Sequence, residues 1–329
     1  MIEVEHLSKQ FVVRRGRVRR ERHVVEAVRD ISFRVYRGEL LGYLGPNGAG
    51  KSTTIKMLTG ILVPSSGRVS VAGLDPSRRR VELAKRIGAM FGQRVQLWWD
   101  LPLVDSFELL RHIYRVPEEH YRASLARFRE VLDLDPFLHT PVRQLSLGQR
   151  IRGELTASML HEPELLFLDE PTIGLDVVAK QRVRDFLVEI NRERGVTVLL
   201  TTHDLGDIER LCERLLVIDH GSLIWDGRIE ELKARYGGDR LLIVDLERPA
   251  PPLAIDGAVV ERVDGPRQWL RFRGPAADLT ARVAATARLV DLQIAEPDIE
   301  EIVRRIYRGE TRETQETREP GSTSEPGSM

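Results

Sequence analysis

The segment GPNGAGKST, residues 45–53, constrains the fold of this chain more than any other. It matches the pattern G-x-x-x-x-G-K-[ST] and lies between an apolar run, ELLGYLG (39–45), and a stretch with helical spacing, KSTTIKMLTGIL (51–62). Glycines let backbone N–H groups turn around phosphate oxygens, and the following helix presents free N–H donors at its positive end. A strand, a glycine loop and a helix in this order predict a nucleoside triphosphate site on an α/β sheet.

The whole loop is expected to contact the nucleotide. Lys51 is placed to reach the β- and γ-phosphates, and the hydroxyl of Ser52 suits Mg²⁺, a cation that prefers oxygen ligands. The predicted nucleotide-binding residues of this segment are Gly45, Pro46, Asn47, Gly48, Ala49, Gly50, Lys51, Ser52 and Thr53.

A pair of carboxylates follows a second apolar run, LLFLDE (165–170). Adjacent acids at the end of a buried strand are costly unless a positive group lies beside them. We interpret Asp169 as a Mg²⁺ partner acting through water, and Glu170 as a base that orients an attacking water. A positioned base contributes roughly 10²–10⁴ in rate.

Strands alternate with helical stretches as far as Gly237 and Gly238, which predicts a mainly parallel sheet covered by helices. We therefore expect a nucleotide-binding domain over residues 1–236. Short strand patterns, with helices at 276–287 and 297–307, predict a small α+β domain over residues 239–309. The tail, residues 310–329, has almost no apolar residues and is expected to be disordered.

Composition limits the other possibilities. Fifty basic and fifty acidic residues cancel, so net charge indicates neither nucleic acid nor a membrane surface as partner. Cys212 is the only cysteine, which excludes an internal disulfide and favours a reducing compartment. The start, MIEVEHLSKQ, lacks the apolar block of a signal peptide, and no window has the roughly 18 apolar residues of a membrane span. We expect a soluble chain that would need a partner to act at a membrane.

The segment LSLGQR (145–150) is polar, contains Gly148, and precedes a helical run, IRGELTASML (151–160). A globular core has no use for such a segment. Together with GPNGAGKST, Gln93, LLFLDEP, GLD (174–176) and His203, it resembles the ATP-binding cassette (ABC) ATPases in order and spacing, over about residues 1–236. The LSxGQ pattern distinguishes this family from other ATPases that share the loop and the acids. The resemblance implies a P-loop ABC core with an antiparallel β subdomain and a helical signature subdomain.

The resemblance also implies roles for individual residues. The ligands would be ATP and Mg²⁺. Gln93 would join Mg²⁺ and sense the membrane partner, with Ser52 and Asp169 as the other metal positions. Glu170 would be the catalytic base and His203 would contact the γ-phosphate. Phe11 is a candidate for stacking on adenine, although a strand phenylalanine is more often part of a core.

The signature segment is expected to act on a second chain. In this family it binds the γ-phosphate of the ATP held by the facing cassette, so Ser146, Gly148 and Gln149 would make contacts in trans, and Asp176 would cross to the opposite subunit. Leu147 stands where the family has Gly, and we expect its side chain to turn outward so that the donors survive. Ile173 also replaces a small residue, and we expect no effect from it.

A cassette without membrane spans implies a separate, multispanning permease. Trp98 and Trp99 follow Gln93, in the region that in this family meets the membrane subunit; alternatively both pack inside the helical subdomain. The run GPNGAGKSTTIKMLTGIL followed by PSSG (64–67), and the C-terminal unit, are similar to bacterial ABC exporter ATPases linked to drug efflux. This similarity predicts an exporter ATPase, which would act as a dimer at the cytoplasmic face of the membrane.

Two other functions stay open on sequence grounds. One is a non-transport ABC ATPase of translation or DNA repair, although this chain has neither a second cassette nor long coiled coils. The other is a cassette that binds ATP without hydrolysing it, against which Lys51, Glu170 and His203 argue. The basic stretch at 14–22, with six arginines, is expected to be a solvated loop or a contact for lipid headgroups or a partner.

Overall fold

The computed structural model describes residues 1–15, 21–91, 95–202, 204–236, 240–295 and 299–307. The chain divides into two compact units, Met1–Gly227 and Arg228–Met329. Helix α8 (Ile229–Tyr236) packs against α10 (Ile299–Tyr307) and therefore belongs to the second unit. The expected boundary at Gly237 and Gly238 lies outside the described residues, and the division falls before α8 rather than after it.

A six-stranded sheet in the order β5-β6-β7-β3-β8-β9 forms the centre of the first unit. The four pairs from β5 to β8 are parallel, as the sequence predicts. Parallel strands covered on both faces are apolar throughout, and every residue of β7 is buried. The strands are β3 (Leu40–Leu44), β5 (Ile87–Phe91), β6 (Leu165–Asp169), β7 (Thr197–Thr201), β8 (Arg214–Asp219) and β9 (Ser222–Arg228).

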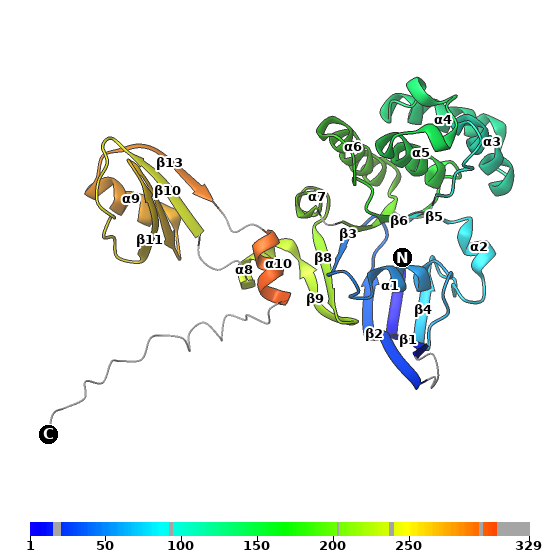
Figure 1. The fold of residues 1–329 in the computed structure, drawn as a ribbon, viewed down its shortest axis with the longest axis horizontal. Coiled ribbons are helices and arrows are strands. Elements are labelled where there is room, and N and C mark those ends of the chain that lie inside the picture. The colour runs from blue at the N-terminus through cyan, green and yellow to red at the C-terminus, as the bar shows by residue number, and fades with distance from the viewer. Residues whose placement is uncertain (16–20, 92–94, 203, 237–239, 296–298, 308–329) are drawn as a thin grey trace. The chain divides into compact units, whose positions relative to one another are not determined.

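Helices gather on one side of this sheet, with α3, α4, α5 and α6 close together in Figure 1. Residues 100–140 are mainly helical, and α3 and α4 each begin directly after a proline, which takes the N-cap position. Gly195 ends α6 in a left-handed conformation with φ 63°. The bounds are α1 (Lys51–Leu58), α2 (Arg80–Ala84), α3 (Leu103–Tyr114), α4 (Glu118–Val131), α5 (Leu147–Met159), α6 (Val177–Arg194) and α7 (Leu205–Leu211).

An antiparallel sheet, β2-β1-β4, makes up the remainder of the first unit. It contains β1 (Ile2–Arg15), β2 (Glu21–Val35) and β4 (Ser66–Val71). Its apolar face packs on α1 through Met57 and Leu58. The two long strands pair as far as Arg15 with Glu21, so the stretch expected to be a loop at 14–22 is strand at both ends. Residues 16–20 lie outside the described part.

The second unit is α+β, as the sequence predicts. Its sheet has the antiparallel order β11-β12-β10-β13, formed by β10 (Arg240–Leu246), β11 (Ala258–Asp264), β12 (Arg267–Phe272) and β13 (Leu289–Ala295). Helix α9 (Ala276–Thr286) contributes Leu279 and Val283 to a core with Leu242, Val244 and Leu270.

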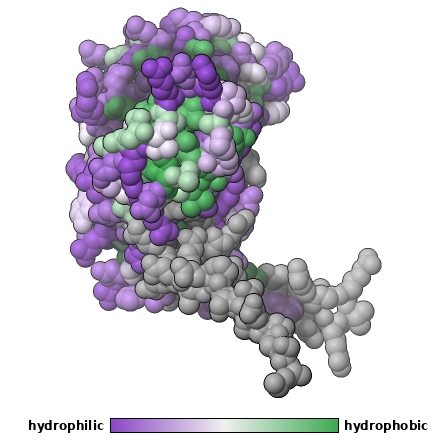
Figure 2. Space-filling model, turned by 90° about the vertical axis from the view of Figure 1, so that its left-hand side faces the viewer, coloured by the Kyte–Doolittle hydropathy of each residue, from purple (hydrophilic) through white to green (hydrophobic). Residues whose placement is uncertain are grey.

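Apolar side chains remain exposed on strands β11 and β13 of this unit. Val259 and Val290 are mostly exposed, and Leu292 and Ile294 are about two-fifths exposed. Figure 2 shows an apolar area bordered by polar side chains on the face of the molecule that it draws. Within the described ranges, no helix combines the length and the apolar character that crossing a bilayer requires.

Candidate nucleotide-binding site

A cavity of about 560 Å³ opens where β3 and β6 end. Because the carboxyl ends of parallel strands meet at one edge of a sheet, the phosphate loop after β3 and the two acids after β6 come together there. This joins motifs that are more than 100 residues apart in the sequence. The lining residues are Ala27, Pro46, Asn47, Gly48, Gly50, Lys51, Ser52, Thr53, Lys56, Phe91, Asp169, Glu170 and Ile173.

Two glycines of the loop are required by close backbone approach. A Cβ on Gly50 would lie 2.4 Å from the carbonyl oxygen of Ala27, and Gly50 has φ 109°. A Cβ on Gly45 would lie 2.4 Å from the carbonyl oxygen of Ile218. Gly50 is also the N-cap of α1, so the loop turns directly into a helix whose first N–H groups have no partner within the helix. This is the geometry of an anion site.

The amine of Lys51 lies back over the loop. Its Nζ donates to the carbonyl oxygen of Gly45 at 2.5 Å and to that of Pro46 at 3.2 Å. Burial lowers the pKa of Lys51, while the nearby carboxylates of Glu170 and Asp169 act in the opposite direction. A cation held among carbonyl oxygens beside two acids is ready to exchange these partners for phosphate oxygens.

Thr201, at the end of β7, holds both acids in place. Its Oγ1 donates to Oδ1 of Asp169 at 2.5 Å, and its carbonyl oxygen accepts the N–H of Glu170 at 2.9 Å. Glu170 has φ 58°, a left-handed conformation that carries its side chain away from the line of β6. Sequence reasoning missed Thr201, although its position at the end of the strand before His203 was a usable signal.

The oxygen groups at this site fit Mg²⁺. The Ser52 hydroxyl and the Asp169 carboxylate line the same cavity. Within the described ranges no group of three or more His, Cys, Asp or Glu side chains could hold a metal. Mg²⁺ is commonly bound by one or two side chains together with waters and substrate phosphates, so the pair suffices. Gln93, the third predicted metal position, lies outside the described residues.

The signature segment forms the start of α5. Ser146 is the N-cap: its Oγ accepts the N–H of Gln149 at 3.2 Å, and its own N–H donates to Oε1 of Gln149 at 2.9 Å. This capping box leaves the hydroxyl hydrogen of Ser146 and the Nε2 group of Gln149 available as donors. Ser146 is exposed, and among the described residues no signature residue lines the cavity of its own chain.

The signature segment packs on the loop that holds the GLD sequence. A Cβ on Gly148 would lie 3.2 Å from Cδ2 of Leu175, so a larger residue at this position would require that leucine side chain to shift slightly. Leu147 was expected to turn outward, and its side chain is 42% exposed. Its inner side lies against Gly174. Asp176 caps α6, where its Oδ1 accepts the N–H of Ala179 at 2.8 Å.

The remaining predicted site residues either do not line this cavity or lie outside the described part of the chain. Phe11 is 36% exposed on β1 and is not one of the residues that line the cavity, whereas Ala27 on the neighbouring strand is. The amine of Lys9 lies 5.3 Å from the centre of the Phe11 ring. His203, like Gln93, lies outside the described residues. Ile173, expected to have no effect, lines the cavity and is 48% exposed.

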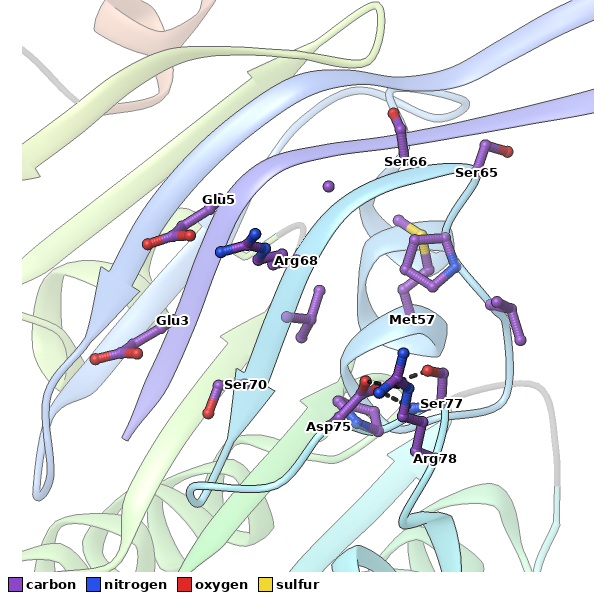
Figure 3. A pocket seen from close by; sticks show the side chains of 15 residues that line it. Glu3, Glu5, Met57, Ser65, Ser66, Arg68, Ser70, Asp75, Ser77 and Arg78 are labelled. Atoms are coloured by element: carbon purple, nitrogen blue, oxygen red, sulfur yellow. Dashed lines mark hydrogen bonds and ion pairs between the residues drawn. The ribbon is translucent and has the colours of Figure 1, made fainter.

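A second cavity of similar size, about 570 Å³, lies between β1, β4 and the loop at 75–78 (Figure 3). Glu3 and Glu5 line it together with Arg68 and Arg78. Asp75 accepts hydrogen bonds from the N–H and the hydroxyl of Ser77, and these lower the pKa of its carboxyl. The cavity contains neither the phosphate loop nor the acid pair, so it is not the nucleotide site.

Comparison with known proteins agrees with this geometry. The family described as "ABC transporter" matches residues 28–173. The daunorubicin resistance ATP-binding protein DrrA3 of Streptomyces coeruleorubidus is 40% identical over 219 residues, which are 67% of this chain and 69% of that protein. The Escherichia coli (strain K12) protein described as "Probable multidrug ABC transporter ATP-binding protein YbhF" is 35% identical over 77% of this chain, but the match spans only 40% of its length.

Among solved structures, the dimeric structure of MJ0796, a bacterial ABC transporter cassette, superposes with a TM-score of 0.62 and 25% identity. The match covers 70% of this chain and 99% of that one. Phosphate loop, acid pair and signature helix on this sheet define an ABC-type ATPase, which confirms the fold class expected from the sequence.

The chain belongs to the ABC transporter family, as an ATP-binding subunit that binds ATP with Mg²⁺ and hydrolyses it. Because the family and its transport-linked members match, the alternatives in translation and DNA repair are not favoured.

Proposed function

We propose that two copies of this chain close head to tail over two ATP molecules and so drive a separate membrane permease. The observation that carries the proposal is the exposed start of α5. Ser146 and Asp176 are exposed on their own chain, and neither lines its cavity. A second copy would bring Ser146, Gly148 and Gln149 onto the γ-phosphate and Asp176 onto the interface. ATP would then stabilise the dimer by mass action, and hydrolysis would release it.

Within the closed site, the roles follow from chemistry and position. Glu170 accepts a proton from the water that attacks the γ-phosphate, while Lys51 and the N-terminus of α1 stabilise the charge on the phosphate oxygens. Ser52, Asp169 and Gln93 hold Mg²⁺, which neutralises phosphate charge when bound. His203 contacts the γ-phosphate, and Phe11 stacks on adenine. Thr201 keeps Asp169 and Glu170 in register.

We further propose that the permease is multispanning, that it places the chain at the cytoplasmic face of the membrane, and that transport runs outward. Trp98 and Trp99 are 37% and 50% exposed, which supports a docking surface more than burial inside the helical subdomain. The two relatives carry daunorubicin-resistance and multidrug descriptions, which supports export of a drug-like molecule.

Affinity purification of the full chain from native membranes tests this function. The chain with Glu170→Gln, kept in ATP and Mg²⁺, should recover a multispanning membrane protein, and a Lys51→Ala chain treated in the same way should recover less of it. Recovery of ribosomes or DNA without such a membrane protein would contradict the proposal.

A further inference from the structure

Residues 96–99 are tied to the middle of the signature helix α5. The carboxylate of Glu154 accepts the N–H of Gln96 at 3.0 Å and 3.3 Å, one bond to each oxygen, and the N–H of Leu97 at 3.4 Å. In return, Nε2 of Gln96 donates to the carbonyl oxygen of Glu154 at 3.1 Å. Hydrogen bonds therefore run in both directions between the helix and this segment.

Glu154 is an unusual choice for this position. Glu154 is only 6% exposed, and its carboxylate accepts hydrogen bonds from the backbone amides of Gln96 and Leu97. Burial raises the pKa of Glu154 to about 7, against the effect of the amides of Leu97 and Gln96 and of Arg150. An apolar residue would fill this place without the desolvation cost, so packing alone does not explain the carboxylate.

A second link joins α5 to the same segment one turn nearer to Ser146. The guanidinium of Arg150 lies 5.9 Å from the centre of the Trp99 ring. Arg150 and Glu154 are four residues apart, so they occupy the same face of α5. The tryptophans have further attachments: the N–H of Trp98 donates to Ser106 at 3.2 Å, and the carbonyl oxygen of Trp99 accepts the N–H of Arg143 at 2.9 Å.

Helix α5 thus connects two surfaces that the proposed function uses. In the proposed dimer, its N-cap residue Ser146 would face the second subunit. Its inner face, through Arg150 and Glu154, contacts the segment that carries the exposed Trp98 and Trp99. A helix is a stiff element, so a displacement at one end reaches the other when both ends are firmly attached.

We propose that Glu154 is a positioning residue that couples movement of the signature helix to the Trp98–Trp99 surface. The inference rests on the proposed function, because the movement in question is closure of the dimer on ATP. Glu154 does not line the nucleotide cavity. Through its hydrogen bonds, Glu154 makes residues 96–99 move together with helix α5.

Intrinsic fluorescence of Trp98 and Trp99 provides the test. The parent chain carries Glu170→Gln to retain ATP, with Trp225→Phe and Trp269→Phe so that only Trp98 and Trp99 report. Emission is recorded with and without ATP and Mg²⁺, and sedimentation velocity on the same samples gives the state of association. The parent is expected to dimerise on ATP and to change its emission.

Glu154→Ala in this parent is expected to dimerise on ATP and to lose the emission change. Glu154→Gln, which keeps one acceptor oxygen, should retain part of it and serves if the alanine variant fails to fold. Glu130→Ala removes an exposed carboxylate from the nearby helix α4 and should leave the change intact.

A Glu154→Ala or folded Glu154→Gln dimer with the full emission change would overturn the coupling role while leaving the proposed function intact. A parent that dimerises without any emission change would overturn it too. A parent that remains monomeric in ATP and Mg²⁺ contradicts the proposed function, and the inference falls with it.

Discussion

Leu147 fills the space above Gly174: a Cβ on Gly174 would lie 2.3 Å from Cδ2 and 3.0 Å from Cγ of Leu147. The signature segment and the loop of Asp176 therefore meet in one chain through a leucine that takes the place of the family's glycine. Since Ser146 adjoins Leu147 and Asp176 follows Gly174 by two positions, this contact holds together two groups that we propose to act on the facing subunit.

Gly174→Ala should destabilise the chain and lower ATP turnover. Alanine at φ 68° is strained by roughly 1–2 kcal/mol, and its methyl group would also push Leu147 aside. Urea unfolding measures the loss of stability, and steady-state phosphate release measures turnover. ATP affinity of the isolated chain should change much less, because Gly174 does not line the cavity.

Leu147→Ala, combined with Gly174→Ala, should relieve the steric part of the destabilisation that Gly174→Ala causes. Residues in direct contact typically show coupling energies of about 0.5–3 kcal/mol, so the double variant should be more stable than the sum of the single changes predicts. Strict additivity of the two changes would show that Leu147 and Gly174 do not interact in solution.

Thr201→Val should raise the Mg²⁺ concentration needed for half-maximal ATPase activity by about tenfold, because valine has the same shape but lacks the donor that holds Asp169. Thr201→Ser keeps the hydroxyl and is the matched control. An unchanged Mg²⁺ requirement in the valine variant would exclude this role for Thr201.

Glu154 should make stability depend on pH. Its pKa rises from an ordinary value of 4.5 to about 7 in the folded chain, so folding favours the protonated form. The contribution is fully present below pH 4.5 and disappears as pH rises through about 7, a loss of roughly 3 kcal/mol. The free energy of unfolding in urea, measured for the unsubstituted chain and for Glu154→Gln between about pH 5.5 and about pH 8, tests this dependence. As pH rises, the glutamine variant should become more stable relative to the unsubstituted chain. A difference in unfolding free energy that does not vary with pH would refute the raised pKa of Glu154.

Trp98→Ala together with Trp99→Ala should weaken association with the permease more than it lowers ATP turnover by the isolated chain. Interface tryptophans often contribute 2 kcal/mol or more, which corresponds to roughly a 30-fold loss of affinity. Tyr36→Ala, another exposed aromatic of the first unit, is the control. Equal losses of permease binding and turnover in a misfolded double variant would favour a structural role for the tryptophans.

Local pattern was sufficient to predict much of the fold. Apolar runs at β3, β6 and β7, each followed by a turn or a polar group, indicate buried parallel strands, and glycine and lysine after β3 specify a phosphate loop. Strand β9 and helix α8 were missed, because β9 alternates between intermediate and exposed residues and lacks a continuous apolar run. The basic stretch at 14–22 was expected to be a loop, but the pairing of β1 with β2 extends to Arg15 and Glu21.

The supporting residues of the site were harder to predict than its chemical groups. Lys51 and Asp169 belong to motifs with fixed spacing. Thr201 and Glu154 act through contacts with residues 32 and 58 positions away, which no local pattern reveals. Leu147 was recognised as a departure from the family, yet its contact with Gly174 depends on how α5 packs beside the GLD loop.

The most direct test of the account is sedimentation of the full chain carrying Glu170→Gln, saturated with ATP and Mg²⁺. The two-subunit arrangement predicts a stable dimer that dissociates when Ser146→Arg is added, because the arginine side chain would occupy the place of the γ-phosphate. If the Glu170→Gln chain binds ATP and still sediments as a monomer, the shared nucleotide site is contradicted.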